Sequence, residues 1–71
     1  MANKRTQLVA KINWRGEFRV VFEEKNDQMK FVTYRRLWDA GRRTTRKIGE
    51  GLTLADQLAL VIDTINNEKR V

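Results

Sequence analysis

The sequence predicts an α+β fold in which a curved, four-stranded antiparallel sheet is followed by one C-terminal helix, in the order ββββα. Three observations support this prediction. Apolar and polar residues alternate with period two over residues 7–15 and 17–23, polar or glycine-containing segments separate the stretches that favour extended structure, and apolar residues recur at helical spacing after residue 53. We therefore expect a flexible basic N-terminus over residues 1–6 and a single domain over residues 7–71.

The first two strands are expected to form a hairpin. Alternation runs through residues 7–15, Gly16 then permits a tight turn, and alternation resumes over residues 17–23. The side chains expected to face the core are Leu8, Ala10, Ile12 and Trp14 from the first strand and Phe18, Val20 and Phe22 from the second.

The third strand is expected over residues 28–39, after a polar loop at residues 24–27. Both of its faces mix apolar and basic side chains, so alternation alone leaves open which face is buried. Asp-Ala-Gly at residues 39–41 turns the chain into a fourth strand over residues 42–48, where threonine and isoleucine favour extended structure. We expect the Gly-Glu-Gly segment at residues 49–51 to end the sheet.

The helix is expected to begin after Thr53 and to run to about Lys69. Thr53 and Asp56 stand at the positions of a capping box, with aspartate in place of the more usual glutamate. A chain of 71 residues buries only about 60% of its unfolded surface and here has no cysteine, so we expect two copies to associate. Ala59 and Leu60 widen the apolar band of the helix, so they are candidates for a contact beyond the sheet; the alternative is that they only cover the sheet edge. The residues expected at the contact between two copies are Leu58, Ala59, Ile62 and Ile65.

The charge of the chain favours a polyanionic partner. The net charge is +6, and residues 1–49 alone hold thirteen basic and five acidic side chains, so the basic part is the predicted sheet. Nucleic acid is the first expectation and an acidic membrane the second, although a basic amphipathic helix is missing. No apolar run reaches the roughly 20 residues of a membrane span. We expect the cytoplasm or nucleoid of a bacterial or phage-infected cell, or a eukaryotic nucleus.

Enzymatic function is not expected. The sequence has no His, Cys or Ser, so the usual pairs of nucleophile and base cannot form, and neither can a zinc site of the common kind. The glycine-rich stretch at residues 49–51 lacks the Gly-Lys-Ser/Thr ending of a phosphate-binding loop. The chain is therefore interpreted as a binding module without a cofactor, a metal or a small-molecule substrate.

Basic and aromatic residues alternate on the predicted strands, a pattern typical of single-strand binding. Lys and Arg neutralise phosphates, and aromatic faces stack on unpaired bases. For the basic residues the alternative is an ordinary solvated face. About three of the five candidate aromatics are expected in the core, with Trp38 the best candidate for exposure. The aromatic candidates are Trp14, Phe22, Phe31, Tyr34 and Trp38.

Residues 34–54 resemble the DNA-binding domain of the transcriptional coactivator positive cofactor 4 family. They hold a strand ending in Tyr-Arg-Arg-Leu-Trp-Asp, a short turn, a basic strand and then Lys-Ile-Gly-Glu-Gly-Leu-Thr-Leu before the helix. The architecture is similar over residues 7–69, and the lack of an acidic, serine-rich tail resembles the compact bacterial or phage form. Glu50 departs from the family pattern, which usually has lysine there, and the loop before the third strand is longer.

The resemblance implies a homodimer whose curved sheets hold two antiparallel single strands of DNA with little sequence preference. It places Arg35 at the family's DNA-facing arginine, Trp38 at its aromatic position, and Lys47, or Arg46 in the alternative register, at a basic position of the fourth strand. The residues expected to contact DNA are Lys11, Arg15, Arg19, Lys30, Phe31, Arg35, Trp38, Arg43, Arg46 and Lys47.

The resemblance also implies an assignment of the faces of the third strand. Phe31, Thr33 and Arg35 would face DNA, while Val32 and Tyr34 would pack on the helix. The expected function is a single-stranded DNA-binding protein acting in transcription, or in replication and repair. Two alternatives are a duplex-binding sheet like the arm-binding domains of tyrosine recombinases and a regulator whose basic sheet binds an acidic protein.

Overall fold

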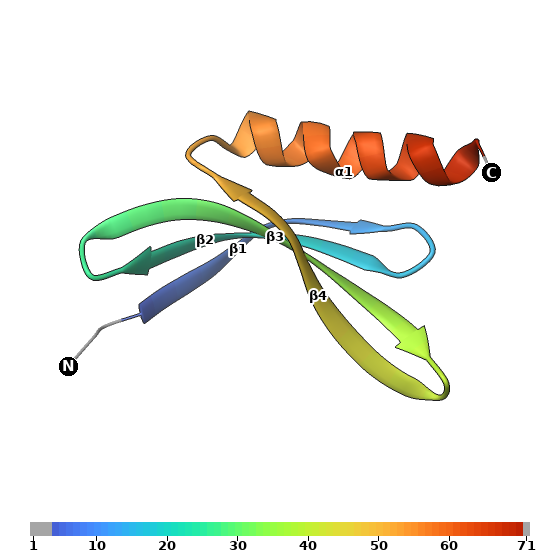
Figure 1. Cartoon of the computed structure of the whole chain (residues 1–71). Coiled ribbons are helices and arrows are strands. Elements are labelled where there is room, and N and C mark those ends of the chain that lie inside the picture. The colour runs from blue at the N-terminus through green and yellow to red at the C-terminus, as the bar shows by residue number, and fades with distance from the viewer. Residues whose placement is uncertain (1–3, 71) are drawn as a thin grey trace.

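The computed structural model describes residues 4–70 and has the ββββα order that the sequence predicts (Figure 1). The strands are β1 (Lys4–Asn13), β2 (Glu17–Lys25), β3 (Gln28–Asp39) and β4 (Arg42–Gly51), and the helix is α1 (Leu54–Lys69). The four strands form one antiparallel sheet in sequence order, and α1 lies across one of its faces. We call this side the helix face and the opposite side the open face.

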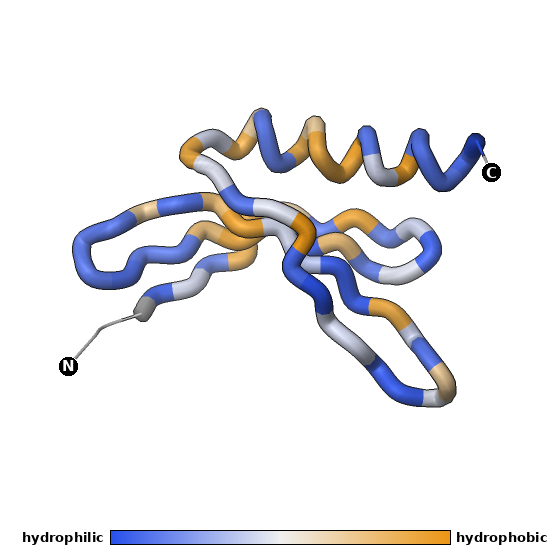
Figure 2. The backbone as a smooth tube through the Cα atoms, in the orientation of Figure 1, coloured by the Kyte–Doolittle hydropathy of each residue, from blue (hydrophilic) through white to orange (hydrophobic). Residues whose placement is uncertain are grey.

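The core lies between the sheet and α1. Phe18 and Val20 of β2 and Val61 of α1 are fully buried there, as the alternation of the second strand predicts. Figure 2 shows hydrophobic residues concentrated where the strands cross beneath the helix, whereas the turn between β2 and β3 is hydrophilic. The helix begins where expected, because the Thr53 hydroxyl accepts a hydrogen bond of 3.2 Å from the Asp56 backbone N–H.

Strand β1 differs from the prediction in two ways. It begins at Lys4, so residues 4–6 belong to the sheet, while residues 1–3 lie outside the described part of the chain. A bulge between Leu8 and Ala10 also shifts the register of β1 against β2. Because of the bulge, residues on its two sides follow opposite alternation. Ala10 and Ile12 pack on the core as predicted, but Leu8 faces the open side and is 49% exposed.

The predicted faces of β3 are wrong. Thr33 donates a hydrogen bond of 2.7 Å to Gln57 of the helix, and Arg35 pairs with Glu68 near the end of the helix. Thr33 and Arg35 therefore lie on the helix face together with Phe31, which packs against the core. Val32 and Tyr34 alternate with them and lie on the open face, the reverse of the expected arrangement.

The glycines after the basic strand do not end the sheet. β4 continues to Gly51, and Gly49 and Gly51 lie beneath the helix. A Cβ atom on Gly49 would come within 2.3 Å of the Leu60 side chain, so the missing side chain lets the helix approach the strand closely. Glycine at this position permits close packing of a helix on a strand. From the sequence alone, such a glycine cannot be distinguished from one that ends a strand.

The hairpin of β3 and β4 extends beyond the rest of the sheet. The last pair between β2 and β3 joins Glu17 to Arg36, so the residues beyond it pair only with each other. We call residues 37–44 the arm. Figure 1 shows the arm projecting away from the helix, and Figure 2 shows that most of it is hydrophilic.

Candidate nucleic-acid interface

A row of four polar side chains crosses the open face. Lys11 pairs with Arg19, Arg19 with Tyr34, and Tyr34 with Lys47, one residue from each strand. Directly paired residues share a face of the sheet, so the strand register places these side chains in one line. Three of the residues expected to contact DNA thus lie together: Lys11, Arg19 and Lys47.

Acidic side chains pair with most of the basic groups on this face. The Glu17 carboxylate lies 2.5 Å from Arg19 Nε, 3.7 Å from Lys11 Nζ and 3.6 Å from Arg36 Nη1. The hydrogen bond from Arg19 lowers the pKa of Glu17, and nearby cations lower it further. Glu17 therefore stays ionised at neutral pH and offsets part of the positive charge in the centre of the sheet.

Glu50 has the same role nearer the edge of the sheet. Its carboxylate lies 2.6 Å from Lys30 Nζ and 3.1 Å from Lys47 Nζ. The hydrogen bond from Lys30 lowers the pKa of Glu50, and that from Lys47 adds to the effect. These exposed pairs contribute little to stability, but each carboxylate would repel a phosphate that approached the lysines.

Tyr34 is the aromatic residue at the centre of the open face. Its hydroxyl donates a hydrogen bond of 2.8 Å to Glu23, and burial together with this bond raises the pKa of Tyr34 to about 12. Glu23 itself is only 8% exposed. The hydrogen bond from its hydroxyl to Glu23 therefore fixes the orientation of the Tyr34 side chain on the open face.

The arm and its base carry the arginines of the basic surface that are least engaged with acids, although Asp39 lies opposite Arg42 in the strand register. In the described part of the chain, residues 4–70, no ion pair engages Arg42, Arg43 or Arg46. Residues 38–47 are exposed without interruption. Trp38, which pairs with Arg43, is 71% exposed, and the Arg43 guanidinium lies 5.5 Å from its ring centroid. The expectation that Trp38 is exposed is confirmed.

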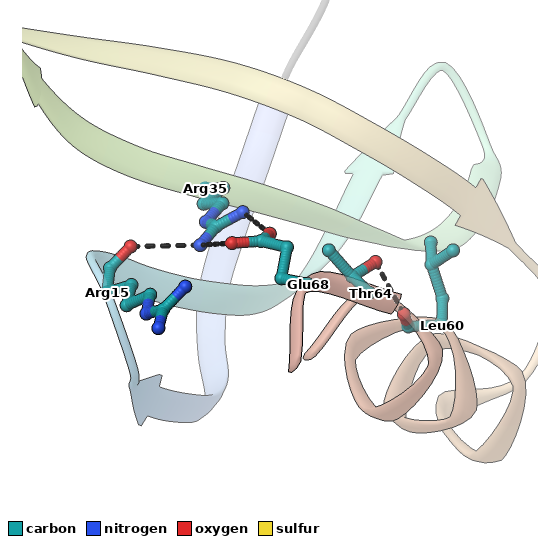
Figure 3. A network of polar contacts seen from close by, with 5 residues as sticks. All are labelled: Arg15, Arg35, Leu60, Thr64 and Glu68. Atoms are coloured by element: carbon teal, nitrogen blue, oxygen red, sulfur yellow. Dashed lines mark hydrogen bonds and ion pairs between the residues drawn. The ribbon is translucent and has the colours of Figure 1, made fainter. Parts of the chain in front are cut away.

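Two residues of the expected site lie under the helix instead. Arg35 is only 9% exposed; its guanidinium pairs with the Glu68 carboxylate through both Nη atoms and donates a further bond of 2.9 Å to the Arg15 carbonyl (Figure 3). It also lies 4.6 Å from the Phe18 ring centroid. The Phe31 ring packs 5.1 Å from that of Phe22. Arg35 and Phe31 hold the helix and the sheet together and are not available to a ligand on the open face.

The other expected positions divide between the two faces. Lys30 and Arg43 lie on the open face, as their partners Glu23 and Trp38 do. Arg46 pairs with Arg35 and so points to the helix side, but it lies on the edge strand and is exposed. Arg15 lies in the turn between β1 and β2 with its guanidinium 4.8 Å from the Trp14 ring centroid.

The residues expected at a dimer contact also divide. Leu58 and Ile65 pack against the core, so their apolar groups are already partly covered within one chain. Ala59 and Ile62 point outward, and 57% of Ile62 is exposed. Leu60 lies over Gly49 of the edge strand β4, which fits the alternative that it covers the sheet edge.

Sequence reasoning missed Arg36 and Arg42 as members of the basic surface. Arg36 belongs to the face of β3 that was expected to pack on the helix, and Arg42 was expected at the start of the fourth strand but not among the residues that contact DNA. A signal for the correct face was present: Asn26 and Asp27 form a two-residue turn with φ of 52° and 62°, so Lys25 pairs with Gln28 and Phe22 with Phe31. Because Phe22 was assigned to the core, this register places Phe31 there as well.

Among the described residues, 4–70, two other kinds of feature are absent, a cluster of metal ligands and a membrane-spanning helix. No cluster of three or more potential metal-ligating side chains occurs there, and α1 is too short and too polar to cross a bilayer. Scans against family models and searches of curated proteins and solved structures find no match to the chain. The candidate interface therefore rests on the geometry of its residues.

Proposed function

We propose that the chain is a non-catalytic protein that binds single-stranded DNA with little sequence preference, through the arm and the adjoining open face. The observation that carries the proposal is the exposed ring of Trp38 with the Arg43 guanidinium against it on the open face. Arg42 and Arg46 are exposed on the other face of the same ribbon and form no ion pair within residues 4–70, so they add to its positive charge. This surface replaces the one expected from the third strand, since Arg35 and Phe31 are engaged with the helix.

The chemistry of the arm suits an unpaired strand. Arginine neutralises phosphates and releases the counterions condensed on them, which makes affinity depend on salt. An exposed indole offers a stacking surface worth about 1–3 kcal/mol per base, and stacking tolerates any base. A base within a duplex is stacked on both sides and presents no such face, so Trp38 favours single strands.

We further propose that two chains associate through the outer side of α1 and that the dimer acts in transcription, or in replication and repair. Support for the association comes from Ile62, which leaves an apolar side chain 57% exposed on the helix, with Ala59 one turn before it. Equilibrium sedimentation at micromolar concentration should give twice the monomer mass. Ile62→Glu should return the monomer mass, whereas Asp63→Asn, a polar change next to it, should not.

The test of binding is a comparison of oligonucleotides by fluorescence anisotropy. A dT strand of about 20 nucleotides should bind more tightly than a duplex of equal length. Arg43→Ala should weaken binding to dT and reduce the slope of log K against log salt by about 0.7, the contribution of one phosphate contact. Lys25→Ala, the same loss of charge at the opposite end of β2, should leave the slope unchanged. Equal or tighter duplex binding would contradict the proposal.

A second candidate is duplex recognition, and one observation favours it. The arm is a two-stranded β-ribbon that projects from the body, and the major groove of DNA admits such a ribbon. In that case Trp38→Ala should have little effect on affinity, because no base is available for stacking. Loss of single-strand binding in Trp38→Ala, with duplex binding unchanged, would exclude this candidate.

A further inference from the structure

A small pocket lies where the arm leaves the sheet. Its volume is about 210 Å³, below the roughly 300 Å³ at which pockets for drug-sized ligands begin. It can hold one ring system and its substituents, but not several stacked bases. The residues that line it are Gly16, Glu17, Arg36, Leu37, Trp38 and Arg43.

The floor of the pocket is fixed by backbone packing. Gly16 has φ of 112°, and a Cβ atom there would lie 2.6 Å from the Arg36 carbonyl oxygen and 2.7 Å from Leu37. The turn between β1 and β2 thus lies directly against β3 at the base of the arm. The turn is also held from below, since Arg35 donates to the Arg15 carbonyl. The floor of the pocket is therefore formed by constrained backbone, whereas its walls are side chains of Glu17 and of the arm and its base.

The walls combine three kinds of chemistry. Trp38 supplies an aromatic face, Arg36 and Arg43 supply two guanidinium groups, and Glu17 supplies a carboxylate. Glu17 is ionised, because the hydrogen bond from Arg19 lowers its pKa, and an ionised carboxylate accepts hydrogen bonds but donates none. A ligand that satisfies all three needs a flat ring, a phosphate and a hydrogen-bond donor on the edge of the ring.

We propose that the pocket holds one nucleotide of the bound strand and that Glu17 selects a base with an exocyclic amino group, cytosine in preference to thymine. This inference rests on the proposed function and adds a base preference at a single position. The base stacks on Trp38 and its phosphate lies between Arg36 and Arg43. The amino group of cytosine donates to a carboxylate, the pairing that Glu and Asp make with this base.

Thymine and uracil fit the carboxylate poorly. They present a carbonyl oxygen at the position of the cytosine amino group, and their ring N–H is flanked by two carbonyl oxygens. A carboxylate that approaches either edge meets the negative partial charge of a carbonyl oxygen. This repulsion, set against the hydrogen bond that the amino group of cytosine donates, is what produces discrimination.

Glu50 provides a matched control. It is the other open-face carboxylate that pairs with more than one cation, through Lys30 and Lys47, but it does not line the pocket. Glu17→Gln and Glu50→Gln each remove one negative charge from the same face. Both should raise affinity for every oligonucleotide, because a phosphate is no longer repelled. Only Glu17→Gln should change the preference between bases, since an amide can donate to thymine as well as accept from cytosine.

The experiment measures the affinities of dC, dT and dU homopolymers of equal length for the full chain at neutral to slightly alkaline pH. The wild-type protein should bind dC about fivefold more tightly than dT or dU, within the range that one correct base-edge contact provides. Glu17→Gln should bring the three affinities together, and Glu50→Gln should keep their ratio. The dU strand tests whether the amino group, and not the thymine methyl group, determines the preference.

The outcomes separate the inference from the proposed function. Equal affinity of the wild-type protein for dC and dT would overturn the base preference and leave single-strand binding intact. A dC preference that persists in folded Glu17→Gln would also overturn it, because the selection would then arise elsewhere. Absence of binding to all three strands would overturn the proposed function itself. The wild-type comparison needs no variant, so it decides the question even if Glu17→Gln does not fold.

Discussion

Two arginines of the same hairpin show how differently the sheet body and the arm use one residue type. Arg35 of β3 lies under the helix, where its two Nη atoms donate to Glu68 and to the Arg15 carbonyl. Arg43 of β4 lies exposed on the arm, with its guanidinium 5.5 Å from the Trp38 ring centroid. The distance from the helix, and not the local sequence, decides whether a basic side chain supports the fold or remains free for a ligand.

The largest expected difference between the two regions comes from their aromatic residues. Phe18→Ala removes a fully buried ring from the core and should cost about 3–5 kcal/mol of stability, enough to unfold a domain of this size. Trp38→Ala removes a larger ring from the arm and should change stability by less than about 0.5 kcal/mol. Urea denaturation followed by circular dichroism measures both. A comparable loss for Trp38→Ala would show that the arm is part of the core.

The glycines of the two turns should differ next. Gly16 and Gly41 both have positive φ, at 112° and 78°, so alanine is strained at either position. Gly16→Ala also forces its Cβ against the Arg36 carbonyl and should cost about 3 kcal/mol. Gly41→Ala has open space around it and should cost about 1 kcal/mol.

Melting temperatures of the two glycine variants provide the measurement. If both variants lose the same stability, the contact between the first turn and β3 is looser than the structure indicates.

Alanine variants of Arg35 and Arg43 should separate the effects on stability from the effects on binding. Arg35→Ala removes hydrogen bonds between charged groups and should cost about 2 kcal/mol of stability. Arg43→Ala should leave the melting temperature unchanged and weaken oligonucleotide binding. The two readouts are thermal denaturation and anisotropy on the same preparations. A loss of binding in folded Arg35→Ala that matched the loss in Arg43→Ala would return Arg35 to the interface.

The smallest expected effect is a dependence of stability on pH. Hydrogen bonds from Arg35 lower the pKa of Glu68 from its ordinary value of 4.5. A carboxyl group with a lowered pKa in the folded state stabilises the fold above its unfolded pKa and loses this contribution as the pH falls through the folded value. The melting temperature should therefore fall below about pH 4.5. Glu68→Gln should show a shallower fall, and an identical profile would mean that other carboxylates account for it.

The sequence was sufficient for the elements but not for the faces of β3. Alternation located the first two strands, turn residues and β propensity located the third and fourth, and the Thr53 cap located the helix, because all of these patterns are local. The face of β3 depends on partners far away in the chain: Thr33 bonds to Gln57, 24 residues on, and Arg35 bonds to Glu68, 33 residues on. Polar residues on a buried face look like surface residues until their partners are known.

The candidate site was predictable in part for the same reason. The charge of the hairpin and the exposure of Trp38 follow from composition and from position near a turn. The neutralisation of Lys30 and Lys47 by Glu50, and the projection of the arm beyond β2, depend on register across strands. The bulge in β1, which turned Leu8 outward, left no signal that alternation could detect.

The projection of the arm has a consequence for its motions. Residues 37–44 have strand partners only within their own hairpin, so their amide protons should exchange with deuterium through local opening, while those beneath α1 should require global unfolding. The ribbon can thus change its twist without disturbing the packed layers. We expect the arm to adapt its conformation to a bound strand while the layers beneath α1 stay unchanged. Amide exchange in the arm should then slow when a strand binds.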